Sequence, residues 1–335
     1  MPKFSILMPA YNAEKYIDKA IKSVINQTFD SWELVIVNDA STDDTDKIVM
    51  SYAEKEKRIR YFKNETNSGS ANQPRLKAAR LAEGKYIATL DSDDTIEPRF
   101  LEKLNIVHER TGADIVISQM IMIDEMGKEL NRVPKAGYDM TQVITGKEAC
   151  SKTIGKWEIG FNGSSSSSSL YKSLCYREMD KEMNADEINT RLYLLKANKV
   201  AFSDAIYFYL QNGSSITKKP SLRSLDRIDT SFQLLEIVEN TYSSTSIEYK
   251  LQYEECISMM VFCSIYVRKY RGVFSSKERD MTDKKVKDYY SILETKSKPS
   301  STLSIRSILL QSNWMTFKFI INLFEIKTLL SKLIK

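Results

Sequence analysis

A short acidic cluster is the first feature of this sequence that points to chemistry. Asp91-Ser92-Asp93-Asp94 directly follows the apolar segment 86–90, which is predicted to be a buried strand. Carboxylates separated by one residue can both bind a hard divalent cation, Mg²⁺ or Mn²⁺, together with the phosphates or ribose that accompany it. The alternative is a helix cap, because a helix is predicted soon afterwards. Three adjacent negative charges exceed what a cap needs and repel one another unless a cation offsets them.

Two further polar features also follow predicted strands. Asp39 comes directly after the segment 32–37, where it can accept a hydrogen bond from a nucleotide base or act as an ordinary turn aspartate. Tyr11 follows the segment 4–8 and can stack on a base, or it belongs to a strand-to-helix turn capped by Asn12. Because these features end strands that are expected to be neighbours, we expect them to lie close together.

The elements that would position these residues alternate between strand and helix patterns. The predicted strands are 4–8, 32–37, 59–62, 86–90 and 114–122, and the predicted helices between them are 13–26, 45–55, 74–82 and 98–111. This pattern predicts an α/β fold with a mostly parallel, doubly wound sheet flanked by helices. Such sheets bind ligands beyond the carboxyl ends of their strands. A helix over 188–197 and a strand over 205–210 are predicted further along the chain.

The second half of the sequence has a different character. Ser164–Ser169 is a run of six serines, which is typical of a linker. From about residue 222 the pattern is mainly helical. Residues 211–335 contain 20 Lys and Arg against 13 Asp and Glu, a net charge of +7, whereas the rest of the chain has a net charge of −2. A basic C-terminal region indicates a polyanionic or membrane partner.

The last segment and the chain as a whole bear on location. Residues 314–335 intersperse aromatic and aliphatic residues with lysines, so this segment either lies in a membrane interface or packs on the core as a terminal helix. No apolar stretch approaches the ~20 residues needed to cross a bilayer, and no export signal is recognised. We therefore expect a cytoplasmic protein, either soluble or peripheral on the inner face of the plasma membrane. A single histidine and the absence of a CxxC pair argue against a zinc site.

Four segments in fixed order resemble one enzyme family. MPAYNAEKYIDKAIKSVINQTF, ELVIVNDASTDDT, NSGSANQPR and YIATLDSDD are similar to the motifs of family 2 inverting glycosyltransferases with the GT-A fold. The resemblance is strong over residues 3–110 and weaker up to about residue 217. It implies a nucleotide-sugar donor site, with the roles assigned as follows: Pro9, Tyr11 and Glu14 around the base and ribose, Asp39 on the base (uracil), Arg75 near the diphosphate or donor sugar, Asp91 on the ribose or metal, and Asp93 on the metal.

The same resemblance implies the catalytic base and also reveals departures. Asp186 lies at the aspartate of the family's Glu-Asp pair and would be the general base, with Glu187 as the alternative because the first acid of the pair is Ala185 here. A histidine that some members use as an additional metal ligand near residues 211–212 is absent. The only histidine, His108, lies within a predicted helix, where a structural role is favoured. The serine run replaces an acceptor-side segment of the family.

These observations predict a two-part protein. Residues 1–217 would form a GT-A catalytic domain and residues 218–335 a helical, basic C-terminal region. The expected function is inverting transfer of a sugar from a UDP-sugar to a glycan or lipid-linked acceptor, with Mg²⁺ or Mn²⁺, in bacterial surface polysaccharide biosynthesis; no nucleic-acid partner is expected. Two alternatives remain: a non-catalytic carbohydrate-binding or scaffold subunit, and a sugar-phosphate nucleotidyltransferase. The second lacks the glycine-rich phosphate loop expected after the first strand.

Overall fold

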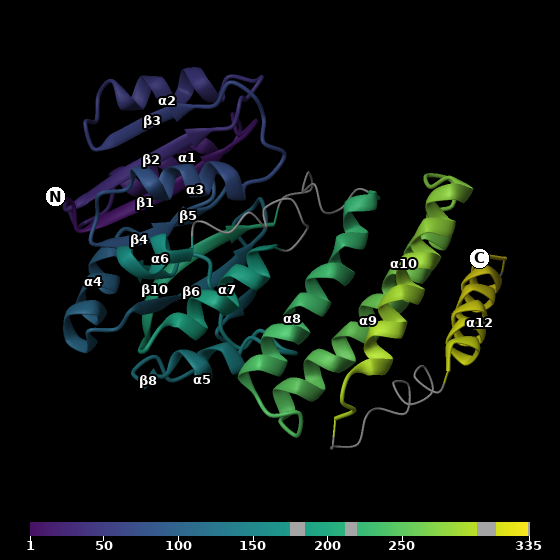
Figure 1. Cartoon of the computed structure of the whole chain (residues 1–335). Helices are drawn as coiled ribbons and strands as arrows, with labels where there is room; N and C mark the ends of the chain where they lie inside the picture. The colour runs from purple at the N-terminus through teal and green to yellow at the C-terminus, as the bar shows by residue number, and fades with distance from the viewer. Residues whose placement is uncertain (175–184, 212–219, 300–312, 334–335) are drawn as a thin grey trace. The chain divides into compact units, whose positions relative to one another are not determined.

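The computed structural model describes residues 1–174, 185–211, 220–299 and 313–333, with side chains described as far as Leu323 in the last segment (Figure 1). The chain divides into two compact units. The first comprises Met1–Lys181 and Asn189–Ser214, and the second comprises Glu182–Ile188 and Ser215–Lys335.

A ten-stranded mixed sheet forms the centre of the first unit (Figure 1). The strand order is β3-β2-β1-β4-β9-β6-β10-β5, with β7 paired to β6 and β8 to β10. Pairing is parallel among β3, β2, β1 and β4 and between β6 and β10, whereas β5, β7, β8 and β9 pair antiparallel. The strands are β1 (Phe4–Ala10), β2 (Trp32–Asn38), β3 (Ile59–Lys63), β4 (Tyr86–Thr89), β5 (Thr95–Ile96), β6 (Ile115–Ile123), β7 (Glu129–Val133), β8 (Val143–Ile144), β9 (Ser165–Ser167) and β10 (Val200–Leu210).

Helices cover both faces of this sheet. They are α1 (Ile17–Ile25), α2 (Thr45–Ala53), α3 (Asn72–Leu81), α4 (Phe100–Thr111), α5 (Gly146–Ser151), α6 (Ser168–Leu174) and α7 (Ala185–Lys196). Ile6 and Met8 of β1 belong to a core cluster with residues of α1 and α4. Leu7 points to the opposite face because side chains alternate along a strand, and it is also fully buried. Helix α3 contacts β1 and β2. The doubly wound α/β fold is therefore confirmed, with antiparallel strands added in its second half.

The serine run forms a strand, contrary to the linker interpretation. Ser165–Ser167 is β9, which lies between β4 and β6 and pairs antiparallel with both. Ser165 and Ser166 are 0% and 1% exposed. Serine has little intrinsic preference for strands, so pairing on both sides, and not local sequence, determines this structure.

The second unit contains helices α8 (Arg227–Thr241), α9 (Ile247–Lys269), α10 (Ser276–Thr295) and α12 (Trp314–Leu333), preceded by a short 3-10 turn, η2 (Leu222–Asp226). Helix α9 contacts α8, α10 and α12 (Figure 1). Ser275 begins α10 with a capping box, in which Glu278 binds back to the backbone N–H of Ser275. The helical character predicted for this region is thus observed in the residues that the structure describes.

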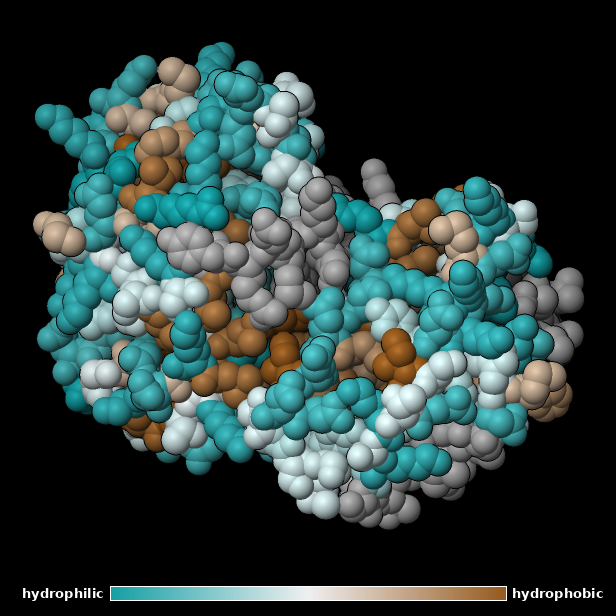
Figure 2. Space-filling model, in the orientation of Figure 1, coloured by the Kyte–Doolittle hydropathy of each residue, from teal (hydrophilic) through white to brown (hydrophobic). Residues whose placement is uncertain are grey.

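Most of the face shown in Figure 2 is hydrophilic, with apolar side chains gathered in separate groups. Among the described helices, none combines the length and the apolar character that crossing a bilayer requires.

Candidate active site

The carboxyl ends of β1, β2 and β4 bring the predicted donor-site residues to one edge of the sheet. The parallel register pairs Ala10 with Asn38 and Leu7 with Thr89. The strands thus end side by side, and Tyr11, Asp39 and Asp91 follow them on the chain. The juxtaposition expected from the sequence is present in the structure.

Reciprocal hydrogen bonds join the loop after β1 to the loop after β2. The Asn12 N–H donates to Ser41 Oγ at 3.0 Å, and Asn12 Oδ1 accepts from the Thr42 N–H at 2.8 Å. Asn12 has a φ of +48°, which the side-chain bond helps to stabilise. Glu14 also connects these two loops, because its Oε2 accepts from the Asp44 N–H at 3.1 Å. These hydrogen bonds fix the two loops relative to each other at the carboxyl edge of the sheet.

Tyr11 and Pro9 occupy different environments at this edge of the sheet. The Tyr11 side chain is 47% exposed, so its ring is accessible to a planar ligand. Pro9 is buried within β1 opposite Val37, where it shapes the end of the strand. The contribution of Pro9 to the site is therefore through the backbone that carries Tyr11.

Asp39 is buried and held by the segment after β3. It is 2% exposed. Its Oδ1 accepts from Asn64 Nδ2 at 2.7 Å, and its Oδ2 accepts from the backbone N–H and hydroxyl of Ser68 at 2.9 and 2.7 Å. A carboxylate has about four lone-pair positions, so these bonds fix its orientation and leave one position for a ligand N–H. Asn64 and Ser68 were not singled out from the sequence.

Asp91 is paired with Arg75. The guanidinium Nη2 lies 2.6 Å from Asp91 Oδ1, with the two side chains 19% and 33% exposed. Arg75 comes from α3 and Asp91 from the turn after β4, so two of the predicted donor-site residues are in direct contact. A charge-assisted pair of this kind fixes the orientation of both side chains.

Asp91 and Asp93 fit a cation that is shared with a phosphate ligand. Both side chains are partly exposed on the turn after β4. In the described part of the chain, no three His, Cys, Asp or Glu side chains converge in a way that could hold a metal alone. Mg²⁺ is commonly bound by one or two carboxylates that are completed by substrate phosphates and water. Two carboxylates on one turn are therefore donors of the kind that suits Mg²⁺ or Mn²⁺ together with a diphosphate.

Asp94 plays a different part from the other two aspartates of the cluster. It is 1% exposed, its Oδ2 accepts from the Tyr207 hydroxyl at 2.6 Å, and its Oδ1 accepts from the Leu210 N–H at 2.7 Å. Burial, with the charges of Asp91 and Asp93 as a smaller cause, raises the pKa of Asp94 above its ordinary value. Tyr207 was not predicted as a site residue, and no local sequence signal connects it to the acidic cluster.

The predicted base lies in the first turn of α7. Asp186 is exposed and Glu187 is partly exposed.

His108 is part of the core. Its ring stacks on Tyr86 with the centroids 3.7 Å apart, Nδ1 lies 3.1 Å from the Ala113 carbonyl, and Nε2 lies 2.7 Å from Ser165 Oγ. The carbonyl can only accept, so Nδ1 carries the proton and the serine hydroxyl donates to Nε2. Burial lowers the pKa of His108 to about 4. These contacts agree with the structural role that was favoured for His108.

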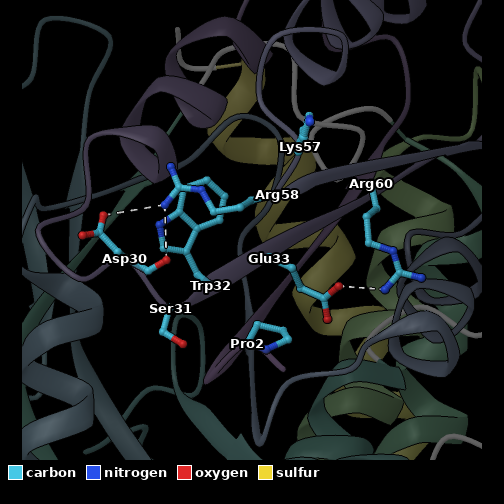
Figure 3. A pocket seen from close by; sticks show the side chains of 8 residues that line it. All are labelled: Pro2, Asp30, Ser31, Trp32, Glu33, Lys57, Arg58 and Arg60. Atoms are coloured by element: carbon cyan, nitrogen blue, oxygen red, sulfur yellow. Dashed lines mark hydrogen bonds and ion pairs between the residues drawn. The ribbon is translucent and has the colours of Figure 1, made fainter.

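A surface pocket of about 330 Å³ lies near the opposite, amino-terminal ends of β1 and β2 (Figure 3). Arg58 covers the Trp32 ring at 3.9 Å and pairs with Glu56 and Asp30, and Arg60 pairs with Glu33. Because these charges are already paired, and because parallel sheets bind ligands at the carboxyl edge, this pocket is not the candidate active site.

A sheet of this topology, with aspartates at the carboxyl ends of β2 and β4, defines the GT-A class of nucleotide-sugar-binding folds. Residues 5–166 match the sequence model of Glycosyl transferase family 2. The part of the chain that matches this family is therefore residues 5–166, and the fold of the first unit is of the GT-A type.

Named relatives and a solved structure agree with this assignment. The glycosyltransferase GlyG of Streptococcus pneumoniae is 27% identical over 222 residues, which is 64% of this chain and 72% of GlyG. The poly(ribitol-phosphate) β-N-acetylglucosaminyltransferase TarS of Staphylococcus aureus is 30% identical over 218 residues, which is 62% of this chain but 35% of TarS. The crystal structure of TarS residues 1–349 with UDP-GlcNAc superposes with a TM-score of 0.64 at 20% identity, covering 87% of this chain and 81% of that one.

Proposed function

We propose that this glycosyltransferase transfers a sugar from a UDP-sugar, with inversion, to a glycan or lipid-linked acceptor in bacterial surface polysaccharide assembly. The observation that carries the donor part is the convergence of Asp39, Asp91 and Asp93 at one sheet edge, with Tyr11 exposed beside them. The catalytic domain would comprise residues 1–217, and residues 218–335 would be a helical accessory region.

The nucleotide assignment rests on Asp39 and is supported by a relative. A fixed carboxylate favours a base that presents an N–H, as uracil does, and penalises a base that leaves it unpaired. TarS was solved with UDP-GlcNAc and is named for acting on poly(ribitol-phosphate). A UDP-sugar donor and a surface polymer or its precursor as the acceptor are consistent with both observations.

The proposed reaction is a single displacement at the anomeric carbon. Asp186 would remove the proton from the attacking acceptor hydroxyl, with Glu187 as the alternative base. Arg75 would bind the diphosphate or donor sugar from α3. Asp91 and Asp93 would hold Mg²⁺ or Mn²⁺, which would supply positive charge to stabilise the departing UDP. No covalent intermediate on the enzyme is needed.

The proposed location is the inner face of the plasma membrane. Helix α12 buries Phe317 and Ile321 on one side, each 2% exposed. On its other side Met315, Phe319 and Leu323 recur every four residues and are 73%, 62% and 47% exposed. A helix face of this kind within a basic region suits contact with an anionic membrane surface.

Metal-dependent hydrolysis of a panel of nucleotide sugars tests the donor assignment. We expect hydrolysis of a UDP-sugar with Mn²⁺ or Mg²⁺, and none in excess chelator. Asp93→Ala should abolish the metal-dependent donor binding and hydrolysis, whereas Asp30→Ala, which changes an aspartate whose side chain is 95% exposed near the opposite edge, should retain them. Unchanged turnover by Asp93→Ala would refute the metal site. A complete absence of donor binding would favour the non-catalytic alternative.

A further inference from the structure

Two buried side chains make the hydrogen bonds that hold the acidic turn after β4 in place. We propose that Asp94 and Tyr207 are positioning residues, which keep the main chain of residues 91–94 in the shape that lets Asp91 and Asp93 bind the cation. This inference rests on the proposed function, because it concerns the same metal site. Neither residue would contact the donor.

Asp94 anchors one end of the turn to β10. Both of its carboxylate oxygens are occupied, one by the Tyr207 hydroxyl and the other by the Leu210 N–H. At 1% exposure the Asp94 side chain is directed into the protein, away from solvent. Asp94 is therefore an internal anchor, while Asp91 and Asp93 remain partly exposed on the turn.

Tyr207 connects both ends of the turn through one oxygen. Its hydroxyl donates to Asp94 and accepts from the Asp91 N–H at 3.2 Å. The Asp94 N–H closes the turn by donating to the Asp91 carbonyl at 3.1 Å. Removal of the Tyr207 hydroxyl would remove its hydrogen bonds to the Asp94 carboxylate and from the Asp91 N–H, while leaving the ring in place.

The Tyr207 ring is itself fixed. Tyr207 is paired with Ile96 of β5, directly after the acidic turn. On another side, a Cβ added at Gly163 would lie 2.4 Å from Tyr207 Cδ2, so only glycine allows the ring to occupy this place. Gly163 also has a φ of +72°, which favours glycine independently. A hydroxyl on a ring held so closely can define the position of the turn.

Cation binding is a sensitive measure of this positioning. Mg²⁺ requires near-ideal octahedral geometry, so a small displacement of Asp93 weakens cation binding more than it weakens binding of the nucleotide base. The variants are Tyr207→Phe and Asp94→Asn, which keep the side-chain shape. Tyr290→Phe is the matched control, because Tyr290 is also buried and its hydroxyl has no hydrogen-bond partner in the described part of the chain.

The measurements are Mn²⁺ binding in the presence of UDP, followed by electron paramagnetic resonance, and the Mn²⁺ concentration that half-saturates donor hydrolysis. We expect Tyr207→Phe and Asp94→Asn each to weaken Mn²⁺ binding by about tenfold, the scale of one lost hydrogen bond that leaves a buried partner unsatisfied. Turnover at saturating Mn²⁺ and the affinity for UDP without metal should stay close to wild type. The double variant should lose less than the sum of the two single losses, because the hydrogen bond between Tyr207 and Asp94 is removed in both single variants.

Other results would overturn the inference. Unchanged Mn²⁺ binding, with or without a lower melting temperature, would leave the pair a purely structural role. Additive losses in the double variant would show that the two residues do not act together. If the wild-type protein binds no Mn²⁺ with UDP, the proposed metal site fails as well, and this result differs from wild-type binding that the variants leave unaltered.

Discussion

The histidine in the core makes a prediction about acid stability. Burial lowers the pKa of His108 to about 4, below its ordinary value of 6.5, so the unfolded chain binds a proton between these values and the folded chain does not. The contribution of neutral His108 to the stability of the folded protein is therefore present above pH 6.5 and decreases as the pH falls toward 4. We expect this residue alone to reduce the free energy of unfolding by about 2 kcal/mol between pH 7.5 and pH 5.

Urea denaturation of the wild type and of His108→Gln at these two pH values measures the effect. The glutamine variant should be less stable at pH 7.5, because the stacking on Tyr86 is lost. Its free energy of unfolding should nevertheless fall less on acidification than that of the wild type. An equal fall in both proteins would mean that His108 is protonated in the folded state.

A second prediction at the scale of residues concerns recognition of the nucleotide base. Asp39 is held in one orientation by Asn64 and Ser68, so it can accept from a base N–H at one position only. Uracil and the larger guanine present their N–H groups at different distances from the ribose, so a site that fits the N–H of uracil does not fit those of guanine. Calorimetry should therefore show tighter binding of UDP than of GDP. Asp39→Asn should reduce this preference, because an amide places an N–H₂ where an acceptor is needed. Equal affinities of the wild type, or tighter GDP, would contradict the uracil assignment.

At the scale of elements, the start of α7 carries two candidate bases. Asp186 and Glu187 are both in its first turn. Position in the family pattern favours Asp186. We expect Asp186→Asn to lower turnover by about 100-fold or more, the usual contribution of a general base, with UDP affinity nearly unchanged. Glu187→Gln should cost much less; the opposite ranking would make Glu187 the base, and two active variants would place it elsewhere.

The elements also show what local sequence can predict. Strands β1, β2 and β4 are apolar runs of buried residues, so their positions, and the edge that gathers Asp39 and Asp91, followed from pattern alone. Helix α1 begins at Ile17 and not at Ala13, and the Ala13 N–H instead donates to Thr45 Oγ1 from the loop after β2. Such long-range contacts have no local signature.

The same limit applies to the site. The acidic cluster was visible in the sequence, but the separate role of Asp94 depends on Tyr207, which lies 113 residues further along the chain. The serine strand β9 is a second feature that local sequence does not predict, because it is formed through its pairing with β4 and β6. Residues that bind a ligand follow strand ends and can be recognised, whereas residues that hold them in place are determined by packing.

At the scale of the whole molecule, charge and apolar surface occur together in the C-terminal region. Residues 211–335 carry a net charge of +7, and the rest of the chain −2. Within that region, α12 exposes Met315, Phe319 and Leu323 along one face. Lysines attract an anionic bilayer over about one Debye length, and the apolar face can then enter the interface. Each feature alone is weak, and together they favour the proposed membrane contact over a terminal helix that only packs on its neighbours.

Co-sedimentation with vesicles that contain anionic lipid tests this combination. We expect binding that weakens as salt rises and that is much weaker with neutral vesicles. Phe319→Glu should reduce it severalfold, because it places a negative charge in the face that enters the interface. Met126→Glu changes a residue that is 94% exposed in the first unit and should lose far less. A chain ending at Ser312 should bind most weakly; if it binds as well as the full chain, the attraction to the membrane arises outside α12 and this helix has no part in it.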